Sequence, residues 1–457
     1  AVTPDAGRLS ATEKSPYATW WFYGIHDSPD SWSVGGPILQ KAGIRKTYHG
    51  VWPKGEYEKY DVTFSGFVYA PGPDQLSEEK FVAYVQKQID EKPRADHIMI
   101  WHESGPKNGI PEEILDLPVP AATDDDRKAG AYVNEIGRLV RKHFPKLRIQ
   151  IGNNSASLGA ACHPLRGGAK PEYYDSIGIE TPSQTFRPEM LRCCAFQGML
   201  IAQEAASYYA KRKVPVAACY EYVYRADRLL GERLQAAWYM RDVLIALANR
   251  MPMISPAVTF DVRNAYYDTL WGRAGMLFRA PYAEPKLSYV AYAALTKALD
   301  GVTFVRELDT GSTTVYAFLF KRKDGRYVTA CWCSRGEAEI ELGLSGSAEA
   351  MDMYGHSIGL NRGVWPFGKR VVACGECPAY VLSDKPAESA KIVKRTFEHG
   401  ARLAAKGVRI GTFDSAEKVT LRPEPKLESE SKHSLPVLKP VIRPFSSTVA
   451  TFSSLLL

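Results

Sequence analysis

Two short segments of the chain each end an apolar, strand-like run on a glutamate beside an aromatic or imidazole ring. They are Ile98-Met-Ile-Trp-His-Glu-Ser104 and Val214-Pro-Val-Ala-Ala-Cys-Tyr-Glu-Tyr222, and their glutamates are Glu103 and Glu221. Cleavage of a glycosidic bond needs one carboxyl group that protonates the leaving oxygen and a second, ionised one that attacks or stabilises the anomeric carbon. Two glutamates at strand ends can supply both groups.

The pattern from about Trp20 to Leu299 predicts a frame that would bring such strand ends together. Short β-branched or aromatic runs alternate with longer helical stretches, which is typical of βαβ units around a parallel sheet. The predicted strands span Thr19–His26, Ile44–Val51, Val62–Ala70, His97–His102, Arg148–Asn153, Ser176–Glu180, Val214–Tyr220 and Met253–Phe260. Eight strands of this kind predict an α/β fold with a closed (β/α)8 TIM barrel.

Helices are clearest in the second half of this region. Apolar residues three or four positions apart predict helices over Arg127–Phe144, Glu232–Ala248 and Tyr289–Leu299. Only about ten residues separate the second and third predicted strands, and they include Pro53 and Gly55. One barrel helix is therefore predicted to be missing there.

After Gly301 the pattern changes to short alternating runs with turn residues between them. The predicted strands are Ser312–Phe320, Tyr327–Cys333, Ala338–Leu342 and Arg370–Leu382, which together indicate a small antiparallel β-sandwich. From residue 385 a short helical stretch gives way to proline, serine and charged residues. The predicted organisation is an N-terminal extension (1–18), a catalytic barrel (19–300), a β-sandwich domain (301–384) and a linker or disordered tail (385–457).

In an α/β barrel the reactive groups sit where strands end, and the two glutamates fall at the fourth and seventh predicted strands. Capping of a strand or pairing with an arginine is the alternative for each. Glu180, in Ile177-Gly-Ile-Glu-Thr-Pro182, is a third strand-end carboxylate and a rival for either role, or a partner for a sugar hydroxyl. A separation of roughly 5 to 5.5 Å between the two catalytic carboxyl groups would favour retention, and roughly 6.5 to 9.5 Å inversion.

The order of these features resembles the clan A retaining glycoside hydrolases, particularly their β-xylosidase and iduronidase-like members. The resemblance covers about residues 97–382 and includes Gly231-Glu-Arg-Leu-Gln-Ala-Ala-Trp238, Pro285-Lys-Leu-Ser-Tyr-Val-Ala-Tyr-Ala-Ala294 and a trailing β domain. It implies that Glu103 is the acid/base and Glu221 the nucleophile, without a metal or organic cofactor. Most of the clan has asparagine before the acid/base; this chain has His102, which is similar to the His-Glu pair of certain mannanase-like members.

Other side chains near the predicted strand ends are candidates for substrate binding. They are His102, His49 after the second strand, Asn153 after the fifth, Glu180, Tyr220 and Tyr222 beside Glu221, and Trp271 beyond the eighth strand. A tyrosine next to a nucleophilic carboxylate can hold its pKa low, and a tryptophan can form a platform for a sugar ring. Packing or loop capping is at least as good an explanation for each of them taken singly.

Four of the eight cysteines fall on predicted strands of the β domain, as Cys331-Trp-Cys333 and Cys374-Gly-Glu-Cys377. Four thiolates brought together would make a tetrahedral zinc site, and a disulfide is another alternative. Strand alternation places Cys331 and Cys333 on one face, where small apolar packing is sufficient. The sequence leaves these three interpretations open.

Composition limits the classes of partner. The 457 residues are 45% hydrophobic and 11% aromatic, with 25 Tyr and 9 Trp, which suits carbohydrate faces and an ordinary core equally. The net charge of +7 comes from interspersed 58 basic and 51 acidic residues, so no basic block predicts nucleic-acid binding. No apolar run approaches the roughly 20 residues of a membrane span, so no membrane partner is expected.

The chain opens Ala1-Val-Thr-Pro-Asp5 without a charged and apolar leader. We therefore expect that a signal peptide has been removed or that the sequence is a fragment of a longer one, and we expect an extracytoplasmic or secreted protein. The sequence indicates no oligomeric state.

The leading hypothesis is a retaining glycoside hydrolase that cleaves O-glycosidic bonds of a polysaccharide or oligosaccharide by double displacement. A non-catalytic carbohydrate-binding protein on a degenerate barrel is the first alternative, suggested by the missing helix and by His102. A polysaccharide lyase or inverting hydrolase, with Glu180 or His102 as base, is the second. The sugar, the linkage and the choice between exo and endo action stay open.

Overall fold

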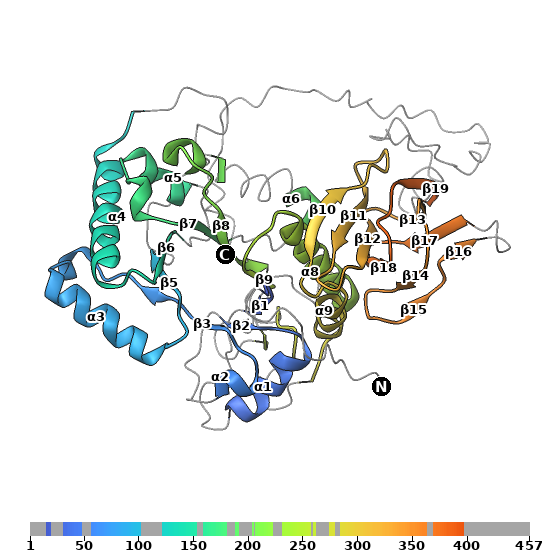
Figure 1. Cartoon of the computed structure of the whole chain (residues 1–457), viewed down its shortest axis with the longest axis horizontal. Coiled ribbons are helices and arrows are strands. Elements are labelled where there is room, and N and C mark those ends of the chain that lie inside the picture. Colours follow the sequence, from blue (N-terminus) through green and yellow to red (C-terminus); the bar gives the residue numbers. More distant parts are fainter. Residues whose placement is uncertain are drawn as a thin grey trace, which may run out of the picture.

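The computed structural model describes thirteen stretches of the chain. They are residues 15–19, 31–47, 56–101, 121–152, 159–180, 188–191, 203–204, 206–222, 231–256, 259–261, 274–278, 284–362 and 369–396. For some of these residues, among them 179–180 and 216–222, the backbone alone is described. Parallel strands with their helices form one part of the molecule and antiparallel strands the other, with α8 and α9 between them (Figure 1).

The parallel strands follow one another in chain order. Strands β1 (Ala18–Thr19), β2 (Lys46–Thr47) and β3 (Phe64–Ser65) form a three-stranded sheet. A six-stranded sheet contains, in this order, β4 (Val68–Tyr69), β5 (His97–Ile100), β6 (Arg148–Ile151), β7 (Ser176–Glu180), β8 (Val216–Tyr222) and β9 (Ile254–Pro256). A parallel bridge from Tyr17 to Ile254 links the start of β1 to β9. Seven of the eight predicted strand regions contain a strand, and Val62–Ala70 holds two short ones. The first, Thr19–His26, meets β1 only at Thr19, and its other residues lie outside the described ones.

Helices lie between these strands and after the last of them. They are α1 (Ser31–Lys41), α2 (Glu56–Lys59), α3 (Glu78–Glu91), α4 (Asp124–His143), α5 (Gly159–Arg166), α6 (Pro188–Leu191), α8 (Gly231–Ala248) and α9 (Leu287–Ala298), with short 3-10 turns at Pro73–Gln75 and Pro171–Tyr173. In the predicted gap between the second and third strands, the described residues from 56 onward form α2, a single turn. Helix α3 was missed, although Phe81 and Val85 are buried at a spacing of four.

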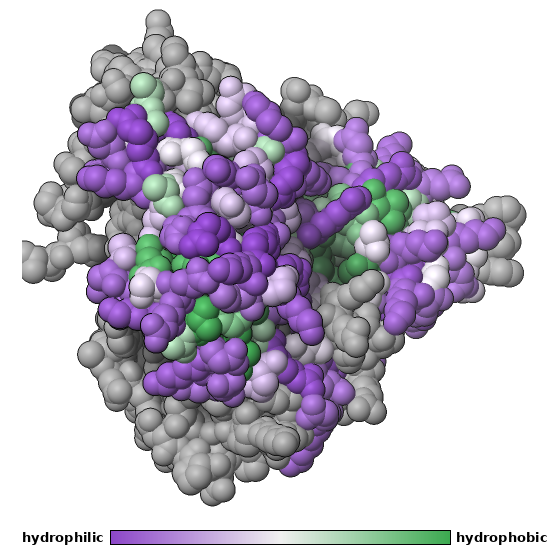
Figure 2. Space-filling view, turned by 60° about the vertical axis from the view of Figure 1, so that its left-hand side comes forward, coloured by the Kyte–Doolittle hydropathy of each residue, from purple (hydrophilic) through white to green (hydrophobic). Residues whose placement is uncertain are grey.

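Helix α4 shows why the sequence forms it where it does. Thr123 accepts a hydrogen bond from the Asp126 backbone nitrogen and Asp126 accepts one from that of Thr123, so a capping box starts the helix three residues before the predicted boundary. Val133, Ile136 and Val140 are buried along one face. The opposite face is charged, and Figure 2 shows mainly hydrophilic side chains over this side of the molecule. Burial of one face stabilises the helix against the sheet.

The antiparallel part contains two sheets. Strands β10 (Thr303–Glu307), β11 (Val315–Lys321), β12 (Tyr327–Cys333), β14 (Ala348–Met351), β15 (Ser357–Ile358) and β18 (Ala379–Ser383) form the first, in the order β10-β11-β12-β18-β14-β15. Strands β13 (Glu337–Leu342), β16 (Asn361–Arg362), β17 (Lys369–Cys374) and β19 (Ala390–Thr396) form the second, in the order β16-β17-β13-β19.

Two predictions for this region were wrong. The predicted strand Arg370–Leu382 is two strands, because β17 pairs with β13 and β18 pairs with β12, in different sheets. The predicted boundary at residue 384 with a helical stretch after it was also wrong, because Ala390–Thr396 is strand β19 and pairs with β13. Ala390 and Arg395 are buried there, so this segment belongs to the folded domain.

The first antiparallel sheet is buried on both faces, and alternation along β11 shows how. Tyr316, Phe318 and Phe320 belong to the large apolar cluster that includes residues of α8 and α9. Val315, Ala317 and Leu319 belong to a second cluster shared with β13 and β17 of the other sheet. A strand places successive side chains on opposite faces, so a near-continuous apolar run suits this double burial. No described helix combines the length and apolar character that a membrane span requires.

Candidate active site

Strands β5, β7 and β8 end at one edge of the parallel sheet, since parallel strands share their direction. Glu180 is the last residue of β7, and Glu221 is the last but one of β8. Glu180 is in register with Tyr220, so the backbones of Glu180 and Glu221 lie at the ends of neighbouring strands. Glu103 follows the end of β5 by three positions. Strand β5 lies two places from β7 in the sheet.

The structure describes the predicted site residues only in part. The backbones of Glu180, Tyr220, Glu221 and Tyr222 are placed on β7 and β8. His49, His102, Glu103, Asn153 and Trp271 lie outside the described residues. The roles assigned to all of these residues stay predictions.

Strand β8 has irregular pairing on both sides. Its register with β9 shifts between Tyr220 and Tyr222, at the position of Glu221. Its register with β7 shifts earlier, between Ile177 and Gly178 of that strand. Bulges of this kind re-aim side chains and are over-represented next to active sites.

A buried amide lies below these strand ends and was missed in the sequence. Gln150 on β6 is fully buried, and its Nε2 donates to the Gly152 carbonyl at 3.1 Å. A Cβ at Gly178 would lie 2.1 Å from that nitrogen, so only glycine fits beside it. The Gln150 Oε1 is buried and has no hydrogen-bond partner among the described residues. The only signal was one polar residue between two apolar ones, Ile149 and Ile151.

Trp101, the first residue after β5, has a strained backbone. Its φ of +64° lies in the left-handed region, which costs a non-glycine residue about 1–3 kcal/mol. Its ring stacks on Tyr132 of α4, with centroids 5.3 Å apart and an interplanar angle of 27°. The Tyr132 hydroxyl donates to the Pro71 carbonyl. Such a stacked pair contributes about 0.5–1.5 kcal/mol beyond its area, which is comparable with the strain.

A buried ion pair fixes the chain after β9. Lys286 Nζ lies 2.5 Å from Asp261 Oδ1, and the two side chains are 2% and 4% exposed. The Gly275 backbone nitrogen also donates to Oδ1, at 3.0 Å. Burial raises the pKa of the Asp261 carboxyl, although Lys286 and the Gly275 hydrogen bond oppose that shift. Because Lys286 directly precedes α9, the pair ties the segment after β9 to the start of that helix.

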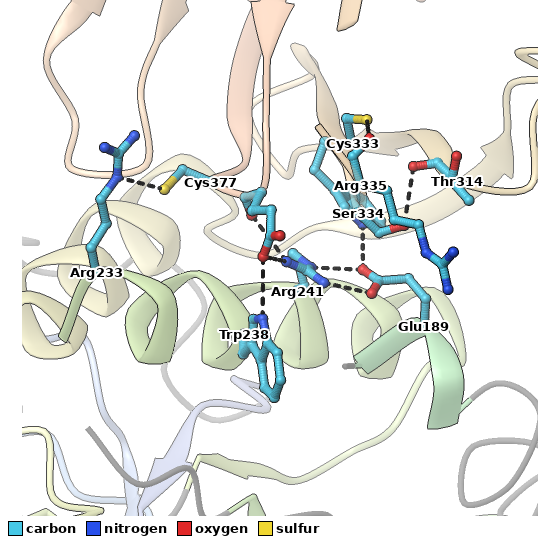
Figure 3. Close-up of polar contacts among 11 residues, drawn as sticks. Glu189, Arg233, Trp238, Arg241, Thr314, Cys333, Ser334, Arg335 and Cys377 are labelled. Carbon is cyan, nitrogen blue, oxygen red and sulfur yellow. Dashed lines mark hydrogen bonds and ion pairs between the residues drawn. The ribbon is translucent and has the colours of Figure 1, made fainter. Parts of the chain in front are cut away.

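A second buried ionic cluster lies between α6, α8 and the first antiparallel sheet (Figure 3). Arg241 of α8 is fully buried and donates to both carboxylate oxygens of Glu189 on α6, at 2.7 and 2.6 Å. Trp332 Nε1 of β12 donates to Glu189 at 2.7 Å. Glu376, in the turn between β17 and β18, accepts from Arg241 at 3.4 Å and from Trp238 Nε1 at 3.5 Å. The helices that follow β7 and β8 are thereby joined to the β domain.

The four cysteines of the β domain do not gather into a metal site. None of Cys331, Cys333, Cys374 and Cys377 forms a disulfide, and no group of metal-binding side chains occurs within the described residues. Cys331, Cys333 and Cys374 pack in the apolar cluster between the sheets, as the packing interpretation predicts. Burial raises the pKa of Cys331 to about 12, so its thiol stays protonated. Cys377 instead accepts from Arg233 Nε at 3.4 Å.

Comparison of the sequence with protein-family models and with curated proteins gave no match. Among solved structures, a family 39 glycoside hydrolase from the gut symbiont Bacteroides cellulosilyticus WH2 has a TM-score of 0.59 at 14% identity, with 82% of each chain covered. A GH51 arabinofuranosidase from Xanthomonas axonopodis pv. citri has a TM-score of 0.50 at 10% identity, over 82% of this chain and 97% of that one. A family 51 α-L-arabinofuranosidase from Bifidobacterium longum also has 0.50, at 8% identity, over 83% and 97%. At these identities the similarity to the family 39 and family 51 enzymes is one of fold.

Proposed function

We propose that the chain is a retaining glycoside hydrolase in which Glu221 is the nucleophile and Glu103 the acid/base. The observation that carries the proposal is the unbroken order of parallel pairings, from β1 to β3 and from β4 to β9. With β3 and β4 counted as one strand around Gly66 and Phe67, the strands that lead to the two glutamates are the fourth and the seventh. The similarity of fold to glycoside hydrolases supports the same assignment.

We infer further that the parallel strands close into a (β/α)8 barrel followed by a β-sandwich. The bridge between Tyr17 and Ile254 supports closure, because it joins the last strand to the first. The Ile254 backbone nitrogen donates to the Pro16 carbonyl at 2.7 Å at that junction. The apolar cluster shared by the two antiparallel sheets supports the sandwich.

In the proposed reaction the Glu221 carboxylate attacks the anomeric carbon as Glu103 donates its proton to the leaving oxygen. The bond from the anomeric carbon to that oxygen breaks, and a glycosyl-enzyme ester forms. Glu103, now ionised, takes a proton from water, whose oxygen displaces Glu221 and releases the sugar with its original anomeric configuration. Glu180, on β7 next to the strand of Glu221, is a candidate to bind a sugar hydroxyl.

The test measures hydrolysis by the wild-type chain and by Glu221→Gln, Glu103→Gln and Glu79→Gln. The first probe is 4-nitrophenyl α-L-arabinofuranoside, because two of the similar structures are arabinofuranosidases, followed by a panel of other aryl glycosides and plant polysaccharides. We expect Glu221→Gln to lose turnover on every substrate. Glu103→Gln should lose on the order of 10²–10⁴-fold where the leaving group needs protonation. Glu79 is exposed on α3, so its variant should keep wild-type activity.

Proton NMR of the first product separates the competing chemistries. Retention of the anomeric configuration is the expected result. The opposite anomer would assign an inverting hydrolase, and an unsaturated uronate would assign a lyase. Glycan binding without hydrolysis, unchanged in both glutamine variants at Glu103 and Glu221, would identify a binding protein instead.

A further inference from the structure

Two neighbouring strands leave the parallel sheet through a left-handed residue at the same level. Ile100 of β5 is in register with Ile151 of β6, so Trp101 and Gly152 come next on each strand. Their φ angles are +64° and +77°. Glycine adopts this conformation at no steric penalty, whereas a bulky residue does so only when its surroundings impose it. The side chain of Trp101 must therefore make contacts that stabilise the left-handed conformation, and glycine has no side chain to make them.

The backbone is anchored up to the residue before Trp101. The Met99 carbonyl accepts from the Ala70 nitrogen at 2.9 Å, and the Ile100 carbonyl accepts from the Gly152 nitrogen at 2.8 Å. The strand itself is thus fixed on both sides, by β4 and by β6. The dihedral angles of Trp101 therefore set the direction in which the chain leaves this strand.

The ring of Trp101 is held in turn by a chain of contacts from two other elements. Its partner in the stack, Tyr132, projects from α4, and the Tyr132 hydroxyl is bonded to the carbonyl of Pro71, just after β4. Both rings are half-buried, and burial raises the pKa of Tyr132 to about 12, so its hydroxyl stays protonated and keeps donating. Pro71, Tyr132 and Trp101, here called the aromatic clamp, connect three consecutive parts of the fold.

We propose that Trp101 is a positioning residue for the acid/base. The aromatic clamp holds residue 101 in its left-handed conformation and so directs Glu103, two residues further on, toward the leaving oxygen. This inference rests on the proposed function, because it assigns to Trp101 an effect exerted only through Glu103. Positioning matters because a displacement of about 1 Å can lower a rate by about 10²-fold.

The experiment compares two leaving groups on the sugar that the wild-type chain hydrolyses. Phenol is a poor leaving group and needs a proton from the acid, whereas 2,4-dinitrophenolate leaves without one. We expect Trp101→Gly, which tolerates the φ angle but lacks the ring, to lower kcat/KM on the phenyl glycoside on the order of 10- to 100-fold. On the 2,4-dinitrophenyl glycoside the same variant should stay within about threefold of wild type. Tyr132→Leu should likewise lower kcat/KM on the phenyl glycoside and leave it nearly unchanged on the 2,4-dinitrophenyl glycoside. Trp101→Phe, which keeps a stacking ring, should recover most of the kcat/KM on the phenyl glycoside.

Controls separate the clamp from the fold and from the proposed function. The ratio of the two kcat/KM values does not depend on how much of a variant is folded, so an equal loss on both substrates would reduce Trp101 to a structural role and overturn the inference. Tyr208→Leu removes an aromatic ring that is 59% exposed, and it should leave the ratio unchanged. Glu103→Gln must itself lower kcat/KM on the phenyl glycoside much more than on the 2,4-dinitrophenyl glycoside. If it lowers kcat/KM on both substrates equally, the acid/base assignment fails. A wild-type chain that hydrolyses no glycoside rejects the proposed function and the clamp together.

Discussion

Lys46 on β2 carries an ammonium group whose pKa is lowered to about 8, chiefly because burial penalises its charge. Arg148 lowers the pKa further and Asp96 opposes the shift. Since the folded-state value lies below the ordinary 10.5, the unfolded chain binds more protons between the two values. The free energy of unfolding therefore rises with pH through that window, as the buried amine loses its charge, and the penalty is fully present below about pH 8.

We expect Lys46→Met to remove this dependence. Urea unfolding at pH 7 and at pH 10 should show wild type gaining about 1–3 kcal/mol relative to the variant as the pH rises. Loss of the hydrogen bond from Lys46 to the Pro252 carbonyl acts at both pH values and cancels in that difference. Lys80→Met, at an exposed site on α3, is the matched control and should follow wild type. If the free energy of unfolding changes with pH in the same way for wild type and Lys46→Met, the burial of Lys46 does not cause the pH dependence.

At the same scale, the sequence indicated strand-end carboxylates but not the residues around them. Glu180 and Glu221 could be placed because an apolar run of strand length ends at each of them. Gln150 could not, since its burial depends on the missing side chain of Gly178 on the next strand, a contact that no local pattern contains. The backbone of Trp101 is likewise invisible, because tryptophan carries no sequence signal for a left-handed conformation.

At the scale of elements, the pair between Arg241 of α8 and Glu189 of α6 provides a sharp test of packing. The two side chains are 0% and 7% exposed, so Arg241→Met would leave a buried carboxylate without its cation. Breaking a buried pair from one side costs about 3–5 kcal/mol, whereas replacing both partners by apolar residues is often nearly neutral. We expect Arg241→Met to lower the free energy of unfolding by about 3–5 kcal/mol. The double variant Arg241→Met/Glu189→Met should recover a substantial part of that free energy.

Denaturant unfolding of the single and double variants measures the coupling between the two residues. The matched control is Arg138→Met on α4, whose pair with Glu135 is 45% and 38% exposed. An exposed pair contributes only about 0–1 kcal/mol. If Arg241→Met is no more destabilising than Arg138→Met, the cluster around Arg241 and Glu189 does not hold α6 and α8 to the β domain.

Elements with one buried face were predictable, and those defined by distant partners were not. Helix α4 follows from the spacing of Val133, Ile136 and Val140, and only its first turn was missed because the cap at Thr123 precedes the apolar pattern. Strands β17 and β18 lie in one apolar stretch, and the change of sheet between them depends on pairing with β13 and β12. Strand β19 carries three basic residues among its seven, so its pairing with β13 outweighs its composition.

At the scale of the whole molecule, the parallel and antiparallel parts share one apolar core. Trp332 and Tyr380 of the β domain belong to the same buried cluster as Trp238 and Tyr292 of α8 and α9. Polar contacts cross the junction as well, since Arg322 donates to the Lys297 and Ala298 carbonyls at the end of α9, at 2.9 and 2.6 Å. A junction that is largely apolar resembles a single core more than a contact between independent domains.

We therefore expect that a chain truncated after Gly301 does not fold on its own. Truncation exposes Trp238 and leaves the buried guanidinium of Arg241 without Glu376 and its surrounding sheet. Calorimetry of the whole chain should show one cooperative transition for the two parts, and the truncated chain should aggregate or lack such a transition. A soluble truncated chain that unfolds cooperatively would make the β domain an independent appendage. Equal activity of that chain on aryl glycosides would show in addition that the loops after β7 and β8 keep their arrangement without it.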